Sequence, residues 1–268
     1  MDDRPIGVFD SGLGGLTTVK RLSELLPDED IVYLGDTGRV PYGTRSRETI
    51  LRYARQDAAF LMGYNIKAMV VACNTACSVG LDELVLSVPV PVYGVIEEPS
   101  VRAARTSRNN RIGVIGTPAT IRSGAYEKAI SAIMPDAEVT SAACPLFVPM
   151  VENGRVGAGD IVIETLAREY LTPLIERGID TLILGCTHYP LLLEVIYAVT
   201  GPGITLVDSG EVTAERVAWD MVSMGLIAAR RGGARQYFIT DSTEGFSKMA
   251  SLFLRADVGG AVTQVELE

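Results

Sequence analysis

The chain has 268 residues, of which 47% are hydrophobic and 21% charged, so it can fold around one large or two small cores and is not disordered. Its net charge of −9 argues against nucleic acid or an anionic membrane as the main ligand, but leaves small anions open, because backbone N–H groups can bind a carboxylate. Four cysteines, no signal peptide and no apolar run of transmembrane length predict a cytoplasmic protein with free thiols.

Short apolar runs alternate with longer segments of helical periodicity. The runs predict nine strands, at residues 6–9, 31–34, 68–72, 92–95, 112–115, 139–142, 182–184, 205–207 and 237–240. Between them, residues 46–62 and 160–177 carry apolar side chains at helical spacing. This alternation predicts an α/β fold with parallel sheets and helices on both faces.

The pattern occurs twice along the chain. The segment Val8-Phe9-Asp10-Ser11-Gly12 corresponds to Val114-Ile115-Gly116-Thr117-Pro118, and Cys73-Asn74-Thr75 corresponds to Cys186-Thr187-His188. Two copies of one α/β unit are therefore predicted, with the seam near residues 97–110. The C-terminal segment holds two predicted helices and one predicted strand, which is too little for a third domain, so it should pack back on one of the units.

The two cysteine motifs are the strongest functional signal. Cys73 and Cys186 each follow an apolar strand and precede small polar residues that open a helix, where free N–H groups and the helix dipole favour a thiolate. A matched pair suggests two acid/base groups facing each other across a cleft, because ligands bind at the carboxyl ends of parallel strands. The alternative is that both are small buried hydrophobes, as we interpret Cys77 and Cys144.

Two further residues could assist the thiols. His188 is the only histidine and lies two residues after Cys186, where it could polarise that thiol or bind a substrate carboxylate. Glu152 is an acid in an apolar stretch and could orient His188. The alternatives are a histidine without a role and an exposed loop acid.

Two loops complete the candidate site. Asp10 and Ser11 open a glycine-rich turn that lacks the spacing of a P-loop or of GxGxxG, so it is a tight turn rather than a nucleotide site. Pro41-Tyr42-Gly43 could offer backbone amides to a carboxylate or be a generic turn. None of the four lysines lies at a strand end, which argues against a pyridoxal Schiff base, and one histidine leaves too few ligands for an ordinary zinc site.

In these motifs the chain resembles the glutamate racemases of the aspartate/glutamate racemase superfamily. The matching segments are residues 9–15, 35–37, 40–43, 72–76, 115–117, 151–152 and 184–191. The resemblance implies two flavodoxin-like domains with pseudo-twofold symmetry and an active site between them, formed by residues 1–98 plus 210–268 and by residues 99–209. It also implies a homodimer that interconverts L- and D-glutamate for peptidoglycan without cofactor or metal.

Carried over by position, the resemblance makes Cys73 and Cys186 the catalytic thiols, with Asp10, Glu152 and His188 assisting proton transfer. The expected substrate-binding residues are Asp10, Ser11, Pro41, Tyr42, Gly43, Asn74, Thr75, Thr117, Thr187 and His188. Chemistry agrees with this assignment, because racemisation removes the Cα proton from one face and returns a proton to the other, which calls for two groups. Three alternatives remain: a racemase acting on aspartate or hydantoins, a hydrolase with Cys73 as nucleophile, and a non-catalytic glutamate-binding protein.

Overall fold

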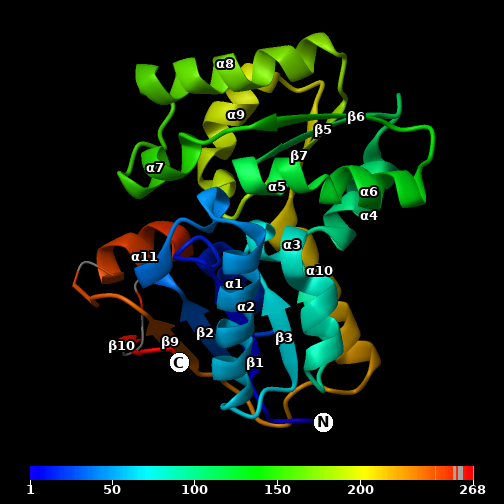
Figure 1. The fold of residues 1–268 in the computed structure, drawn as a ribbon. Coiled ribbons are helices and arrows are strands. Elements are labelled where there is room, and N and C mark those ends of the chain that lie inside the picture. Colours follow the sequence, from blue (N-terminus) through cyan, green and yellow to red (C-terminus); the bar gives the residue numbers. More distant parts are fainter. Residues whose placement is uncertain (245, 256–257, 259–261, 268) are drawn as a thin grey trace.

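The computed structural model describes residues 1–244, 246–255, 258 and 262–267, and it contains two parallel sheets. Within the described residues, the spatial order of the first sheet is β10 (Val262–Gln264), β9 (Arg235–Ile239), β2 (Ile31–Gly35), β1 (Ile6–Asp10), β3 (Ala68–Val71) and β4 (Val92–Gly94). The order of the second is β6 (Glu138–Ala143), β5 (Arg111–Gly116), β7 (Thr181–Gly185) and β8 (Thr205–Asp208). Figure 1 shows the first sheet in the lower unit and the second in the upper one.

The two sheets repeat one arrangement. The order β2-β1-β3-β4 of the first matches β6-β5-β7-β8 of the second, and every neighbouring pair is parallel. The prediction of a doubled α/β unit is thus confirmed, as are all nine predicted strands. The prediction of one strand in the C-terminal segment was wrong, because the short β10 pairs with β9 beyond it.

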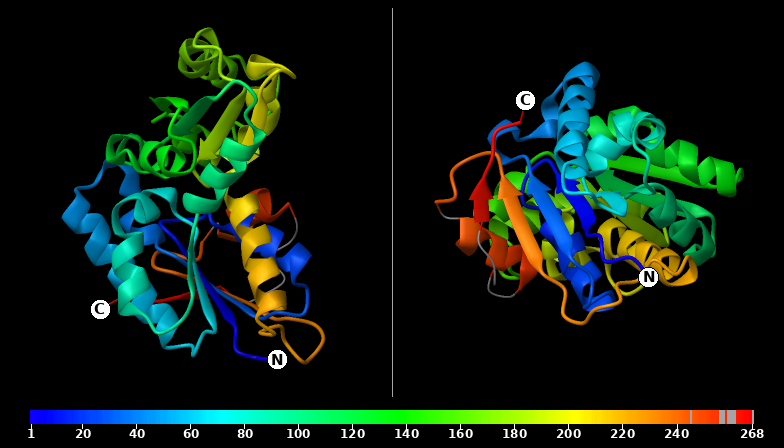
Figure 2. Two further views of the ribbon diagram at one scale, coloured as in Figure 1. Left: turned by 90° about the vertical axis from the view of Figure 1, so that its right-hand side faces the viewer. Right: turned by 90° about the horizontal axis from the view of Figure 1, so that it is seen from below.

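Helices cover both faces of the first sheet. The helices are α1 (Leu16–Leu25), α2 (Arg47–Met62), α3 (Asn74–Ser87), α4 (Glu97–Thr106), α5 (Pro118–Ser123), α6 (Ala125–Ile133), α7 (Phe147–Glu152), α8 (Ile161–Glu176), α9 (Leu193–Thr200), α10 (Ser209–Ser223) and α11 (Phe246–Leu254). Figure 2 shows α2 and α3 on one side of the first sheet, with α1 and α10 on the other. No helix among the described residues is both long and apolar enough to cross a membrane.

The helix boundaries follow from local chemistry. The predicted helices at 46–62 and 160–177 are α2 and α8, and each starts after a side chain that satisfies a free N–H group of the first turn. Ser46 Oγ accepts from Thr49 N at 3.3 Å, and Asp160 Oδ1 accepts from Val162 N at 3.0 Å. These two helices therefore begin where the sequence places a capping residue.

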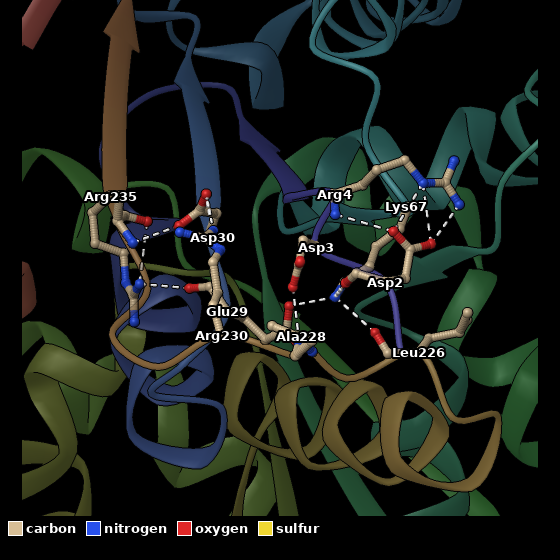
Figure 3. A network of polar contacts seen from close by, with 12 residues as sticks. Asp2, Asp3, Arg4, Glu29, Asp30, Lys67, Leu226, Ala228, Arg230 and Arg235 are labelled. Atoms are coloured by element: carbon tan, nitrogen blue, oxygen red, sulfur yellow. Dashed lines mark hydrogen bonds and ion pairs between the residues drawn. The ribbon is translucent and has the colours of Figure 1, made fainter.

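A buried lysine holds the returning C-terminal segment to the first sheet (Figure 3). Lys67 is 1% exposed, and its Nζ donates to the carbonyl oxygens of Asp2 and Leu226, each at 2.7 Å, and to the carboxylate of Glu29. Glu29 Oε1 in turn accepts from Ala228 N at 2.7 Å. The charge of Lys67 is thus compensated by groups from several segments, and the chain after α10 is directed toward β9.

The strands place the C-terminal segment with the first unit, because β9 lies against β2. The second sheet is built only from strands between residues 111 and 208. The division into residues 1–98 plus 210–268 and residues 99–209 stays a prediction.

Candidate active site

A pocket of about 340 Å³ lies between the two units, at the carboxyl ends of their strands. This is the edge where parallel sheets bind ligands. It is lined by Ser11, Val40, Pro41, Tyr42, Gly43, Thr44, Cys73, Asn74, Thr75, Thr117, Pro118, Cys144, Pro145, Val148, Pro149, Glu152, Cys186, Thr187 and His188. Every residue predicted for the site is therefore in the pocket wall except Asp10.

Cys73 occupies the N-terminus of α3, directly after the third strand of the first sheet. Its Sγ accepts from Ala76 N at 3.4 Å, and the thiol contacts Ser11 Oγ at the same distance. Burial and the nearby charge of Asp10 raise the pKa of the Cys73 thiol to about 12, although these hydrogen bonds oppose the shift. Cys73 is therefore a thiol at neutral pH.

Cys186 has a different neighbour. It follows β7, and its Sγ lies 3.9 Å from Nδ1 of His188, whose Nε2 lies 3.3 Å from Oε1 of Glu152. Burial alone would lower the pKa of His188, but the contacts with Cys186 and Glu152 outweigh it and raise the pKa to about 10. His188 therefore carries its positive charge at neutral pH and places it beside the Cys186 sulfur.

Asp10 lies behind the pocket wall. Its side chain is fully buried, and Oδ2 accepts from Gly12 N at 3.0 Å. Oδ1 lies 3.5 Å from Oγ1 of Thr187, which links Asp10 to the second unit. Burial raises the pKa of the Asp10 carboxyl, while the charge of His188 opposes the shift. In this arrangement Asp10 reaches the pocket through its contact with Thr187 and through its charge near Cys73 and His188.

The glycine-rich turn after β1 allows the two units to approach closely. A Cβ at Gly14 would lie 2.2 Å from Thr187 Oγ1 and 2.6 Å from His188 Nδ1, so any larger residue would displace them. A Cβ at Gly15 would lie 2.6 Å from Asp10 Cβ. The turn is thus an inter-unit contact that fixes the catalytic candidates, a role that the sequence analysis missed.

Threonine hydroxyls line the opposite side of the pocket. Thr75 Oγ1 of the first unit and Thr117 Oγ1 of the second lie 2.9 Å apart, and both lie within 3.2 Å of Thr120 Oγ1. Thr117 also starts α5, because its hydroxyl accepts from Thr120 N at 3.3 Å. These hydroxyls can donate to an anion without adding a positive charge to the pocket.

The amide nitrogen of Asn74 is occupied by partners within the protein. Nδ2 donates to Tyr126 Oη at 2.8 Å, to Ser209 Oγ at 3.1 Å and to Val95 O at 3.2 Å. The side chain therefore holds the two units together behind the pocket. The predicted contact between Asn74 and substrate then falls on its backbone amide at the start of α3.

The pocket wall contains several residues that the sequence analysis did not assign to it. Apolar side chains form part of the wall: Val40, Pro118, Pro145, Val148 and Pro149. Cys144 borders the pocket, but its side chain is fully buried, which agrees with its interpretation as a packing residue. In the sequence, the two prolines at 145 and 149, close to Cys144, are the feature that could have predicted this part of the wall.

Comparisons with known proteins all point to one family of racemases. A family model described as Asp/Glu/Hydantoin racemase matches residues 6–217. The chain is 48% identical over 266 residues to a glutamate racemase of Geobacter metallireducens, covering 99% of this chain and 97% of the relative.

Two solved structures have nearly the same fold. Glutamate racemase isoform RacE1 of Bacillus anthracis superposes with a TM-score of 0.95 at 37% identity, covering 100% of this chain and 99% of that one. A glutamate racemase of Francisella tularensis in complex with D-glutamate superposes with a TM-score of 0.93 at 38% identity, with the same coverage.

Proposed function

The chain belongs to the Asp/Glu/hydantoin racemase family, and from this premise we propose that it interconverts L- and D-glutamate through two thiols, Cys73 and Cys186. It is an amino-acid racemase, an isomerase, by its similarity to glutamate racemases over almost its whole length. The observation that supports the mechanism most strongly is the placement of the two thiols. They come from equivalent positions of two repeated units and line one pocket.

The proposed reaction is a proton exchange at Cα. One cysteine, as thiolate, takes the Cα proton from one face of the amino acid, and the other, as thiol, gives a proton to the opposite face of the planar carbanion. After one turnover the two cysteines have exchanged protonation states, so the reverse reaction can start. The two thiols have different surroundings, because burial and Asp10 raise the pKa of Cys73, whereas Cys186 lies beside the protonated His188.

The carbanion needs stabilisation, because the α-proton of an amino acid is a weak acid. The enclosed pocket supplies neutral donors from several directions, namely the hydroxyls of Ser11, Thr75, Thr117 and Thr187 and the N–H groups at the start of α3. Fixed dipoles in a dry site favour developing negative charge without reorganisation. We assign carboxylate binding to these groups and to the backbone of residues 41–43.

Cationic side chains are not part of this assignment. The nearest candidates in the sequence are Arg39 and Arg45, which flank the loop at residues 41–43, but neither lines the pocket. Arg39 is bound to Asp36 and Asp57 at 2.6 and 3.0 Å. Neutral carboxylate donors can hold both enantiomers, since no arginine or lysine side chain anchors a single pose.

Circular dichroism of L-glutamate incubated with the purified protein, with no cofactor added, tests the proposal. We expect the signal to decay to zero, and D-glutamate to give the mirror-image decay. Aspartate and a hydantoin serve as competing substrates. An optical change with aspartate alone would assign a different racemase. If glutamate binds but its α-proton does not exchange in heavy water, the protein is a binding protein without racemase activity. Acyl-enzyme formation that needs Cys73 and not Cys186 would establish a hydrolase.

We also propose that the enzyme is a cytoplasmic homodimer that supplies D-glutamate for peptidoglycan. All four cysteines are free and buried, which fits a reducing compartment. Sedimentation equilibrium of the purified protein would test the dimer, and a single species of monomer mass at micromolar concentration would contradict it. Rescue by external D-glutamate of cells depleted of the enzyme would test the supply role.

A further inference from the structure

A buried polar cluster lies directly behind the loop at residues 41–43. Tyr42 is 1% exposed, and its hydroxyl contacts two carboxyl groups, Oδ2 of Asp36 and, at 2.9 Å, Oδ2 of Asp57. Both aspartates are fully buried. Arg39 donates to Asp36 Oδ2 at 2.6 Å and to Asp57 Oδ1 at 3.0 Å, and it is held by Gln56 Oε1 at 2.5 Å.

The hydrogen-bond geometry requires one proton more than the ionised side chains provide. The Tyr42 hydroxyl has a single proton, so it can donate to only one of the two carboxyl oxygens that it touches. The other contact places two oxygens at hydrogen-bond distance, which is stabilising only if that carboxyl carries a proton of its own. Two ionised aspartates would also leave a net negative charge buried beside one arginine, which is costly.

Asp57 is the group that holds this proton. Asp36 already accepts hydrogen bonds from Arg39, from the Tyr42 hydroxyl and, on Oδ1, from the hydroxyl of Thr240 at 2.8 Å. These donors stabilise a negative charge on Asp36. Burial and the charge of Asp36 raise the pKa of Asp57 well above its usual range, although Arg39 opposes the shift. With Asp57 neutral, a chain of donors runs from Asp57 to Tyr42 to Asp36, and the charge of Arg39 balances that of Asp36.

The cluster controls a wall of the pocket. The hydroxyl of Tyr42 is turned away from the ligand, so Tyr42 offers only its backbone and ring to the pocket. The next residue, Gly43, faces the second unit so closely that a Cβ there would lie 2.8 Å from Thr117 Cβ. Anchoring the Tyr42 side chain thus fixes the segment that meets the second unit across the substrate.

We propose that a protonated Asp57, acting with Asp36 through the Tyr42 hydroxyl, is a positioning residue that holds the backbone of residues 41–43 in place for a substrate carboxylate. This inference rests on the proposed function, because it assigns these residues to the same pocket. It concerns substrate binding rather than proton transfer, so its effect should fall on KM and leave kcat largely intact.

Two substitutions at Asp57 test the protonation state. Asp57→Ala removes the anchor and should raise KM for both enantiomers about tenfold, the loss of roughly one buried hydrogen bond. Asp57→Asn can still donate to Tyr42 and accept from Arg39, as the protonated acid does, and should restore KM to within about threefold of the unsubstituted enzyme. An ionised Asp57 would give the opposite result, with asparagine no better than alanine.

A matched pair of tyrosines provides the control. Tyr42→Phe removes one hydroxyl from the cluster and should raise KM as Asp57→Ala does. Tyr53→Phe removes a hydroxyl from the neighbouring ring, which packs against Tyr42 in a tilted arrangement with centroids 5.4 Å apart. This variant should leave KM unchanged. Thermal unfolding of each variant separates a lost fold from a displaced loop.

Infrared difference spectra supply a readout that does not depend on activity. At neutral pH, the spectrum of the unsubstituted enzyme minus that of Asp57→Asn should contain the C=O stretch of a protonated carboxyl, because this subtraction removes the bands of other buried acids such as Asp10. If the unsubstituted enzyme does not racemise glutamate, the proposed function is wrong. If it does, but Asp57→Ala and Tyr42→Phe keep its KM or the difference spectrum lacks this band, only the inference about Asp57 is wrong.

Discussion

The surroundings of Cys73 and Cys186 differ far more than their positions do. Both thiols follow a central strand of equivalent sheets, yet Cys73 faces Ser11 and the field of Asp10, whereas Cys186 faces His188 and, through it, Glu152. The repeat thus provides two similar positions in the wall of one pocket. The neighbours differ in charge, since the carboxyl of Asp10 acts on Cys73 whereas His188, whose pKa is raised, lies beside Cys186.

Loss of either thiol should have the largest effect. Cys73→Ser and Cys186→Ser should each lower racemisation by at least about 10²–10⁴-fold, because a full cycle uses both acid/base groups. Elimination from an amino acid with a leaving group on Cβ needs only one base, so each variant should retain it for one enantiomer only. Near-native racemisation by Cys186→Ser would contradict the proposal that both thiols transfer protons.

Removal of the imidazole should affect one half more than the other. His188→Asn should slow, on the order of 10²-fold, the reaction direction that starts at Cys186, and slow the opposite direction less, because the positive charge beside the Cys186 sulfur is lost. Single-turnover α-proton exchange in heavy water, measured separately from L- and D-glutamate, shows the difference. Equal loss in both directions would assign His188 to substrate binding instead.

A larger residue in the glycine-rich turn should also slow mainly the reaction direction that starts at Cys186. Gly14→Ala places a Cβ against Thr187 and His188 and should lower kcat/KM about tenfold, with the larger loss in the direction that starts at Cys186. Gly157→Ala is the matched control, since a Cβ there meets no atom within 4 Å. A loss shared equally by both directions would mean that the turn acts on the whole pocket.

The smallest expected effect is on stability. The pKa of His188 rises from 6.5 to about 10 on folding, so its contribution is fully present below pH 6.5 and lost as the pH rises toward 10. The free energy of unfolding in urea should therefore fall between pH 6.5 and 9. This fall should be weaker in His188→Asn, whereas Cys73→Ser should keep most of it, because the Cys73 thiol has a pKa near 9 when unfolded and about 12 when folded, and so contributes only at the upper end of this range. If the free energy of unfolding depends on pH in the same way in His188→Asn, the positive charge assigned to His188 is wrong.

The parts of the site that could be read from sequence are those fixed by local structure. An apolar run that ends in Cys-Asn-Thr or Cys-Thr-His places the thiol at the end of a strand and the start of a helix or turn, whatever the rest of the chain does. The same holds for Ser46 and Asp160 as helix starts. These features depend on neighbours within a few positions.

The remaining features depend on segments that are distant in sequence. Asp57 lies in the middle of α2 and looks like a solvated helix residue until Arg39 and Tyr42 pack against it. The need for glycine at position 14 arises from Thr187 and His188, which lie far along the chain. Strand β10 has three partly exposed or exposed residues and no apolar alternation, so only its pairing with β9 reveals it.

The return of the C-terminal segment has a consequence for synthesis on the ribosome. The second sheet uses one continuous stretch of chain and can close as soon as β8 emerges, whereas the first sheet waits for β9. Until residues 226 and 228 arrive, Lys67 lacks the carbonyl of Leu226 and Glu29 lacks the N–H group of Ala228. The unit that is translated first is therefore completed last, and a chain that stops after the second sheet carries an unfinished first sheet with a strand edge open to other chains.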